Sequence, residues 1–154
     1  MRVEVKRLSS TAVLPVRGSA QAAGYDLCAD IAEPLAVAPG ETVKVETGLA
    51  FAIPDGYFGG IFARSGLSTK KGLRPANCTG VVDSDYRGPV IVALHNDSAA
   101  ARTIEPRERI AQLILLPYLA AEFEEVEALD ETARGGGGFG STGSGGSSNC
   151  SRKR

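Results

Sequence analysis

Apolar and polar residues alternate over short stretches of this chain, and turn-forming residues separate the stretches. Valine alternates with charged residues in VEVK (3–6) and VKVE (43–46), which is the pattern of a strand with one buried face. Longer apolar runs occupy 48–54, 57–63, 89–95 and 109–118. Pro and Gly residues fall between these runs, and no long segment places its apolar residues at helical spacing. The pattern predicts an all-β sandwich or barrel-like fold.

The chain divides into a folded body and a different C-terminal segment. Within the body one short helix is expected near 65–71, ended by Gly72. The segment 135–154 has no aliphatic residue and a single aromatic one, Phe139. Such a segment cannot bury enough apolar surface to fold by itself. We therefore expect a β-barrel body over 1–130 and a flexible, Gly-rich C-terminal arm over 131–154.

Composition and charge narrow the class of protein. With 154 residues and 43% hydrophobic content, the chain is long enough for one globular core. A formal net charge of −1, 6% aromatic content and no Trp argue against a stable nucleic-acid partner. The apolar runs are too short to span a membrane, and the N-terminus does not resemble a signal peptide. Three Cys without CxxC spacing and one His argue against a disulfide scaffold or a structural zinc site. We expect a cytoplasmic protein with no membrane partner.

Two segments in the first half of the chain could carry chemistry. Asp26 lies in the strand-like segment AGYDLCA (23–29), where a buried carboxylate needs a cationic, metal or hydrogen-bonding partner. Taken alone, Asp26 is more readily a turn-end carboxylate bonded to backbone N–H groups. In ARSGLS (63–68), Arg64 and Ser65 at a strand-to-helix junction could together bind an anion. A helix cap at Ser65 beside a solvated Arg64 explains the same residues and is compatible with that role.

The segment NCTGVVDSDYRG (77–88) is the densest in polar residues. Its centre predicts a β-hairpin with a polar tip, flanked by Gly80 and Gly88. The backbone donors and acceptors of a hairpin could recognise the edge of a flat heterocycle. The alternative is an ordinary acidic turn with Tyr86 packed on the body. Asp83 directly follows two valines and is less typical of a turn residue than Asp85 is.

Two further segments lie later in the chain. Gln112 interrupts the apolar strand ERIAQLIL (108–115), where such a residue is more often a satisfied core amide than a ligand contact. In RGGGGFGSTG (134–143), consecutive glycines free the backbone to wrap a phosphate, and Arg134 adds charge. The segment lacks the Lys-Ser/Thr ending of a P-loop. A flexible linker is the alternative, but Arg134 and Phe139 favour a lid that a ligand orders.

Taken together, the five segments resemble the five motifs of the trimeric dUTPases (deoxyuridine 5′-triphosphate nucleotidohydrolases), in the same order over 23–143. The segments ARSGLS, GVVDSDYRG and RGGGGFGSTG carry the resemblance most specifically. It implies a jelly-roll-like β barrel and a homotrimer with three active sites at the subunit junctions. It also implies hydrolysis of dUTP to dUMP and pyrophosphate, which keeps uracil out of DNA and supplies dUMP for dTMP synthesis.

The resemblance implies a role for individual residues. Asp83 would be the catalytic residue that orients and activates the attacking water, and Asp26 would hold a triphosphate-bound Mg²⁺ through water. Tyr86 would lie against the deoxyribose and leave no space for a 2′-OH. The other implied substrate contacts are Arg64, Ser65, Gly66 and Gln112 at the phosphates, Asn77, Gly80, Val81, Val82 and Ile91 at uracil, and Arg134, Phe139, Gly140, Ser141 and Thr142 in the lid. In that lid Arg134 would grip the γ-phosphate and Phe139 would stack on the uracil.

Some positions depart from the commonest family pattern. Arg107 stands where a Gly is usual, which affects a turn, and Ala63 stands where Pro is frequent. The residues after Gly143, SGGSSNCSRKR, exceed what the fifth motif needs, and a solvated tail is the default interpretation of them.

Two other functions remain as alternatives. A dCTP deaminase shares the fold and the binding of a triphosphate, but its chemistry requires a Glu in the base pocket, and the segment 77–88 offers Asp83 and Asp85 and no Glu. A non-catalytic nucleotide-binding protein of the same fold would lack a site residue, whereas every position that can be matched carries one.

Overall fold

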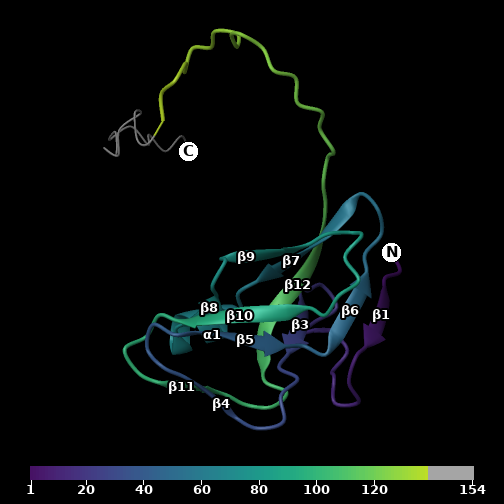
Figure 1. Ribbon diagram of the computed structural model, residues 1–154, viewed down its shortest axis with the longest axis vertical. Helices are drawn as coiled ribbons and strands as arrows, with labels where there is room; N and C mark the ends of the chain where they lie inside the picture. The colour runs from purple at the N-terminus through teal and green to yellow at the C-terminus, as the bar shows by residue number, and fades with distance from the viewer. Residues whose placement is uncertain (139–154) are drawn as a thin grey trace, which may run out of the picture. The chain divides into compact units, whose positions relative to one another are not determined.

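The computed structural model describes residues 1–138 (Figure 1). Contacts divide the chain into two units, Met1–Ala120 and Ala121–Arg154. The predicted boundary near 130 between body and arm stays a prediction. The elements of the first unit are β1 (Glu4–Arg7), β2 (Val16–Arg17), β3 (Tyr25–Cys28), β4 (Leu35–Val37), β5 (Thr42–Glu46), β6 (Leu49–Ala52), β7 (Tyr57–Phe62), α1 (Ser65–Lys71), β8 (Leu73–Pro75), β9 (Thr79–Val82), β10 (Ile91–Asn96), β11 (Arg102–Ile104) and β12 (Arg109–Pro117).

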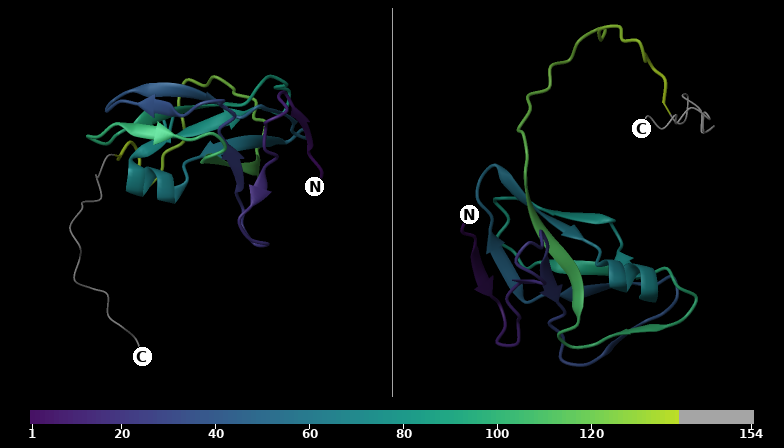
Figure 2. Two further views of the ribbon diagram at one scale, coloured as in Figure 1. Left: turned by 90° about the horizontal axis from the view of Figure 1, so that it is seen from below. Right: turned by 180° about the vertical axis from the view of Figure 1, so that it is seen from behind.

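Antiparallel strands form four small sheets in this unit. The largest has the order β2-β3-β12-β7-β9, and the second has the order β5-β10-β8. The pairs β1-β6 and β11-β4 complete the set. Each sheet brings together strands that are far apart in the sequence, as the central strand β12 lies between β3 and β7; it is the light-green strand in the right view of Figure 2. The predicted all-β fold with a single short helix is confirmed for the described residues, and the architecture is of the jelly-roll type.

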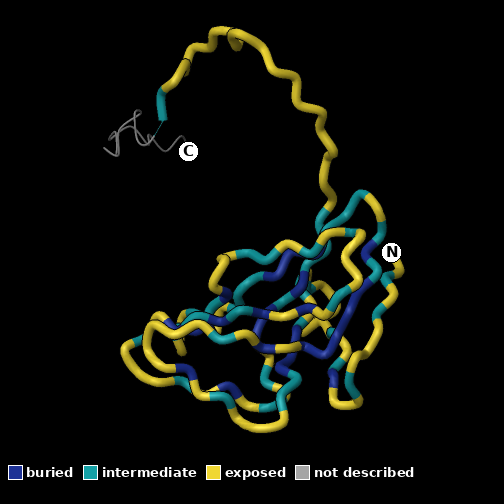
Figure 3. The backbone as a smooth tube through the Cα atoms, in the orientation of Figure 1, coloured by how far each residue is buried: buried dark blue, intermediate teal, exposed yellow. Residues whose placement is uncertain are grey.

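One apolar core holds the sheets together. Its fully buried side chains come from every sheet and include Leu27, Leu49, Leu73, Leu94, Ile104 and Ile110. Figure 3 shows these buried stretches in dark blue inside the first unit. The alternation along β10 buries every second residue and leaves the others more accessible.

The helix α1 matches its predicted range. Gly72 follows it with φ 69° and donates its N–H to the carbonyl of Ser68, so the left-handed residue expected there ends the helix. No helix within residues 1–138 has the length and apolar character needed to cross a membrane.

The second unit has a different character in its described part, 121–138. It contains no helix or strand there, and Phe123, Val126 and Leu129 are exposed. Six acidic residues lie between Glu122 and Glu131, with no Lys or Arg among them.

Candidate active site

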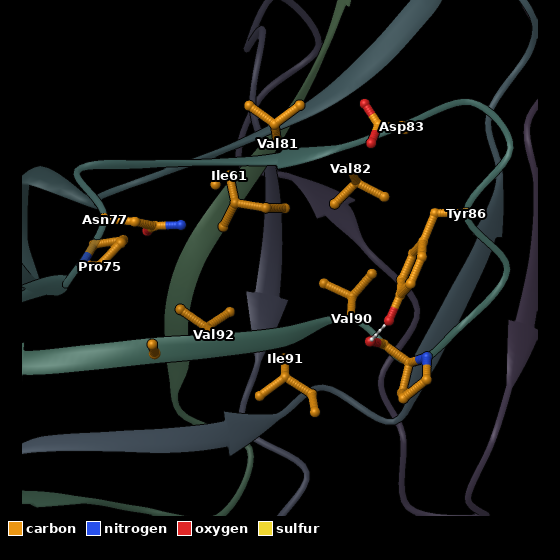
Figure 4. A pocket seen from close by; sticks show the side chains of 13 residues that line it. Ile61, Pro75, Asn77, Val81, Val82, Asp83, Tyr86, Val90, Ile91 and Val92 are labelled. Atoms are coloured by element: carbon orange, nitrogen blue, oxygen red, sulfur yellow. Dashed lines mark hydrogen bonds between the residues drawn. The ribbon is translucent and has the colours of Figure 1, made fainter.

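A pocket of about 290 Å³ lies between β9 and β10, and we call it the base pocket (Figure 4). Asn77 and Tyr86 stand at opposite ends of it, with the apolar side chains of Ile61, Val90 and Val92 between them. This volume is at the lower end of the range for small-molecule sites. The residues of the first unit predicted to contact uracil line it, namely Asn77, Gly80, Val81, Val82 and Ile91, and Asp83 and Tyr86 line it as well.

The predicted β-hairpin at 77–88 is wrong in one respect, because its two arms are not paired with each other. Strand β9 is the edge of the five-stranded sheet and pairs with β7, whereas β10 pairs with β5 and β8 in another sheet. Within the described strands, the edge of β9 that faces away from β7 therefore has no strand partner. Strands β9 and β10 thus belong to different sheets and do not pair with each other. The space between them is the base pocket.

Tyr86 is fixed in place by its own hydroxyl group. The chain turns after β9, where the N–H of Tyr86 donates to the carbonyl of Asp83 at 3.2 Å. The Tyr86 hydroxyl then donates to the carbonyl of Pro89 at 3.1 Å, which holds the ring across the end of the pocket (Figure 4). A Cβ at Gly88 would lie 2.5 Å from that hydroxyl oxygen, so this position accepts no side chain without moving the ring.

Asp83 is the first residue after β9 and is exposed. Its side chain lies at the end of that strand near Val82 and Tyr86 (Figure 4). A carboxylate in this position is accessible to a water molecule beside a ligand in the base pocket. It also lies next to a second hollow, which Asp55 and Asp85 line with it.

A second concave site, which we call the arginine cleft, lies over β3, β12 and the start of α1. Its polar lining consists of Asp26, Arg64, Ser65, Arg109 and Gln112, and Gly66 lines it with its backbone. Arg64 lies two residues after the end of β7 and directly before α1, with extended backbone angles of φ −88° and ψ 127°. The sequence segments 23–29, 63–68 and 108–115 thus meet at one place.

Asp26 lies between the two arginines of the cleft. Arg64 donates its Nε–H to Oδ1 of Asp26 at 2.8 Å, and Arg109 donates from Nη1 to Oδ2 at 3.1 Å. Arg64 also donates from Nη1 to the carbonyl of Arg109 at 3.2 Å. The Asp26 side chain is 13% exposed, so it is a mostly buried carboxylate with a cationic partner on each oxygen. Asp26 thus lies within a strand and accepts its bonds from arginine side chains, so the interpretation as a turn-end carboxylate bonded to backbone N–H groups is wrong.

Arg109 is a cleft residue that the sequence did not single out. In a regular strand, Arg109 and Gln112 would point to opposite faces, because side chains alternate. A β-bulge shifts the register of β12 against β3 between Arg109 and Ala111, and both Ile110 and Ala111 are buried. The bulge therefore returns Arg109 to the face that carries Gln112. The sequence signal for this bulge was the pair of apolar residues Ile110 and Ala111 between the polar residues Arg109 and Gln112, which breaks the alternation of a regular strand.

The side-chain amide of Gln112 is hydrogen-bonded within the chain. Its Nε2 donates to the carbonyl of Ala63 at 2.8 Å, and its register partner on β3 is Asp26. The side chain is half-buried, and its amide lies close to Gly24. Gln112 is thus both a satisfied amide and a residue of the cleft, so the two interpretations made from the sequence are compatible.

The donor set of the cleft fits Mg²⁺ held mainly by a ligand. Residues 1–138 contain no group of three or more His, Cys, Asp or Glu side chains arranged to hold a metal ion. Asp26 is the carboxylate of the cleft, and both its oxygens already accept hydrogen bonds from arginine. Contact through a water molecule leaves those bonds in place, whereas direct coordination would compete with them.

The base pocket and the arginine cleft have no lining residue in common within the part of the chain described. Arg134 belongs to the second unit, where its Nε donates to the carbonyl of Gly137 at 2.9 Å. The predicted lid residues Phe139, Gly140, Ser141 and Thr142 lie outside the described residues, as does the tail after Gly143. The first unit thus brings the predicted residues together in two groups.

The fold and these two sites define a class: a jelly-roll protein that can bind a flat base in one place and an anionic group in another. The chain belongs to the dUTPase family, whose model matches residues 10–143. The enzyme class is therefore that of the deoxyuridine triphosphate nucleotidohydrolases.

Several curated and solved relatives are similar over most of the chain. The deoxyuridine 5′-triphosphate nucleotidohydrolase of Acinetobacter baumannii (strain ATCC 17978) is 45% identical over 148 residues, which cover 93% of this chain and 99% of the relative. That of Desulfitobacterium hafniense (strain DCB-2) is 44% identical over 144 residues, with 93% and 95% covered.

Two solved structures are similar in fold. The dUTPase of Staphylococcus bacteriophage 80alpha with dUpNHpp superposes with a TM-score of 0.84 at 32% identity, covering 92% of this chain and 98% of the phage chain. A mutant dUTPase from phage phi11 of S. aureus superposes with a TM-score of 0.77 at 27% identity, covering 85% and 100%. The phi11 structure is described as revealing the coordination of a structural Mg(II) ion.

Proposed function

We propose that this chain hydrolyses dUTP to dUMP and pyrophosphate by attack of water at the α-phosphorus. The observation that carries the proposal is the position of Asp83, a carboxylate at the end of β9 and at the edge of a pocket of the right kind for a base. The product dUMP would supply dTMP synthesis, and removal of dUTP would keep uracil out of DNA.

Recognition of uracil would come from the unpaired edge of β9 and from the start of β10, before its pairing with β8 begins at Leu94. The backbone of Gly80, Val81, Val82 and Ile91 would offer donors and acceptors to the base, and the Asn77 amide would complete the set. A base whose edge carries a different order of donors and acceptors leaves buried groups unpaired. Such mismatches discriminate by roughly 10⁴-fold in hydrogen-bonding sites.

Discrimination of the sugar would depend on Tyr86. Its ring is held across the end of the base pocket by the bond to the Pro89 carbonyl. A ribose bound there would bring its 2′-OH against the ring, whereas a deoxyribose has no such group. The tether matters because a ring free to rotate away would admit the ribonucleotide.

Asp83 would act as the general base. A carboxylate that accepts a proton from water as the water attacks contributes about 10²–10⁴-fold to a rate. Attack in line with the leaving pyrophosphate requires the phosphate chain to lie in one conformation, and charge neutralisation to reduce its repulsion of the nucleophile. The exposed position of Asp83 gives a water molecule access on the pocket side.

The phosphates would bind in the arginine cleft. Arg64 and Arg109 supply guanidinium groups, Gln112 supplies its amide, and Ser65 and Gly66 supply a hydroxyl and backbone N–H groups. Arg134 would bind the γ-phosphate, and Phe139 with Gly140, Ser141 and Thr142 would form the lid over the nucleotide. Mg²⁺ bound to the triphosphate would lower its negative charge. Asp26 would hold that ion through water.

The protein would act as a homotrimer with active sites shared between subunits. One nucleotide needs both a base site with Asp83 and a phosphate site. In the described part of one chain, these are two cavities with different linings. If the base pocket of one subunit faces the arginine cleft of another, a complete site forms. The separation of the two sites within one chain therefore supports shared active sites.

The experiment that tests the proposal is pyrophosphate release measured with dUTP, dCTP, dTTP and UTP at equal concentration. We expect turnover of dUTP and at least a hundredfold less with each of the other three, since mismatched hydrogen bonding excludes cytosine and close packing excludes the thymine methyl group and the 2′-OH. Ammonia release from dCTP would instead assign the chain to the deaminases. Binding of dUTP without turnover would make it a nucleotide-binding protein.

A further inference from the structure

The pairing of Asp26 with two arginines has a consequence for the phosphate site. The carboxylate joins three segments, because Asp26 is on β3, Arg64 precedes α1 and Arg109 begins β12. An Arg side chain carries five N–H donors. Arg64 uses one for Asp26 and one for the Arg109 carbonyl, and Arg109 uses one for Asp26. The remaining donors of both side chains are available in the cleft.

Two guanidinium groups so close together repel each other, and neither has a second acidic partner in the part of the chain described. Arg109 in particular is 56% exposed, so its long side chain would gain many conformations in the absence of Asp26. The carboxylate accepts one bond on each oxygen and thereby fixes both side chains in one arrangement. The buried position of Asp26 makes it the rigid member of the group.

We propose that Asp26 is a positioning residue that aims Arg64 and Arg109 at the phosphate chain of the nucleotide, and that it does so without a metal ion. This inference rests on the proposed function, since it concerns the same phosphate site. It gives Asp26 a task beside the contact with Mg²⁺ through water. The two tasks are compatible, because a water-mediated contact leaves the arginine bonds in place.

Electrostatics alone makes the opposite prediction, which gives the inference a sharp test. The group has two positive charges and one negative charge, so Asp26→Asn raises its net charge by one unit. If only charge mattered, a phosphate chain would bind more tightly to the variant. If Asp26 positions the arginines, binding weakens, because the amide no longer accepts a charged hydrogen bond on each side.

The test is calorimetric titration with the non-hydrolysable analogue dUpNHpp in buffer with EDTA, with the parent protein and Asp26→Asn. We expect the parent to bind and the variant to bind at least tenfold more weakly. Binding of deoxyuridine, which has no phosphate, should be unchanged. The matched control is Glu108→Gln, which removes one negative charge beside the cleft, where Glu108 pairs with Lys71 and not with the two arginines. The control should bind the analogue as the parent does, or slightly more tightly.

A second variant distinguishes lost positioning of the arginines from a general loss of folding. Arg109→Met replaces an exposed side chain, and the double variant with Asp26→Asn should be hardly weaker than the weaker single variant, because the two residues act as a unit. Equal or tighter metal-free binding by Asp26→Asn would overturn the inference, and so would strictly additive effects. Failure of the parent to turn over dUTP would instead refute the proposed function.

Discussion

A Cβ placed on Gly24 would lie 2.3 Å from Oε1 of Gln112, which is far inside any real contact distance. Gly24 therefore leaves the space in which the Gln112 amide lies. That amide is anchored through its Nε2 to the carbonyl of Ala63, beside the arginine cleft. The absence of a side chain at Gly24 thus makes room for the Gln112 side chain on β12.

We predict that Gly24→Ala lowers the rate of dUTP hydrolysis about 10²-fold, which is the size of effect expected when a site residue is displaced by about 1 Å. Steady-state kinetics measures the effect. If Gly24 acts through Gln112, the double variant with Gln112→Ala is no slower than Gln112→Ala alone. Multiplicative effects in the double variant would show that Gly24 has another role.

Asn96 and Thr47 are the two buried polar residues of the described part of the chain. Asn96 is fully buried and makes four hydrogen bonds: Nδ2 donates to the carbonyls of Val37 and Ala100, and Oδ1 accepts from the N–H and hydroxyl groups of Ser98. Asn96→Ala leaves buried groups without partners, so we predict a loss of about 3 kcal/mol in the free energy of unfolding. Urea unfolding at one fixed protein concentration measures this loss. The exposed substitution Thr103→Ala is the control, and a loss of less than about 1 kcal/mol for Asn96→Ala would contradict the interpretation.

Arg107 occupies a turn position that favours glycine. Its φ is 64°, in the left-handed region, and its N–H donates to the carbonyl of Ala29. This explains why a glycine is usual here and confirms that the departure affects a turn. A side chain at such a φ costs about 1–2 kcal/mol, partly offset by the greater freedom of glycine in the unfolded chain. We predict that Arg107→Gly raises the free energy of unfolding by up to about 1 kcal/mol, measured by urea unfolding. A loss of stability would mean that the Arg107 side chain has a stabilising contact.

The two described cysteines differ in reactivity. Cys28 is buried, and burial together with the negative charge of Asp26 raises the pKa of its thiol, although nearby arginines act in the opposite direction. A raised pKa means less thiolate at a given pH, and the thiolate is the reactive form. Cys78 is exposed. We predict that iodoacetamide labels Cys78 well before Cys28 in the folded protein at about pH 7.5. At that pH an ordinary thiol is only about a tenth ionised. Peptide mass spectrometry measures each site separately, and equal labelling would contradict the buried position of Cys28.

The sequence predicted the elements that depend on local patterns. The strands around Val5 and Val45 and the helix 65–71 follow from alternation and from a glycine at the helix end, and both kinds of signal lie within a few residues. Asp26 was correctly expected in a strand, where a buried carboxylate needs a partner.

Long-range pairing was not predictable in the same way. The sequence around Asp83 has the pattern of a hairpin, but the choice of β7 as the partner of β9, and of β5 and β8 as the partners of β10, depends on segments far away in the chain. Arg109 was missed because a bulge in β12 changes the face on which it lies. The family resemblance predicted the site residues, and the geometry added Arg109 and the pairing of both arginines with Asp26.

The central claim is that the Asp83 carboxylate activates the water that attacks dUTP. The most direct measurement is the rate of pyrophosphate release from saturating dUTP by Asp83→Asn, compared with the parent and with Asp85→Asn, a neighbouring exposed carboxylate as the matched control. We predict a rate about 10²–10⁴-fold below that of the parent for Asp83→Asn, with dUpNHpp still bound, and a nearly unchanged rate for Asp85→Asn. Hydrolysis by Asp83→Asn at the rate of the parent would contradict the claim.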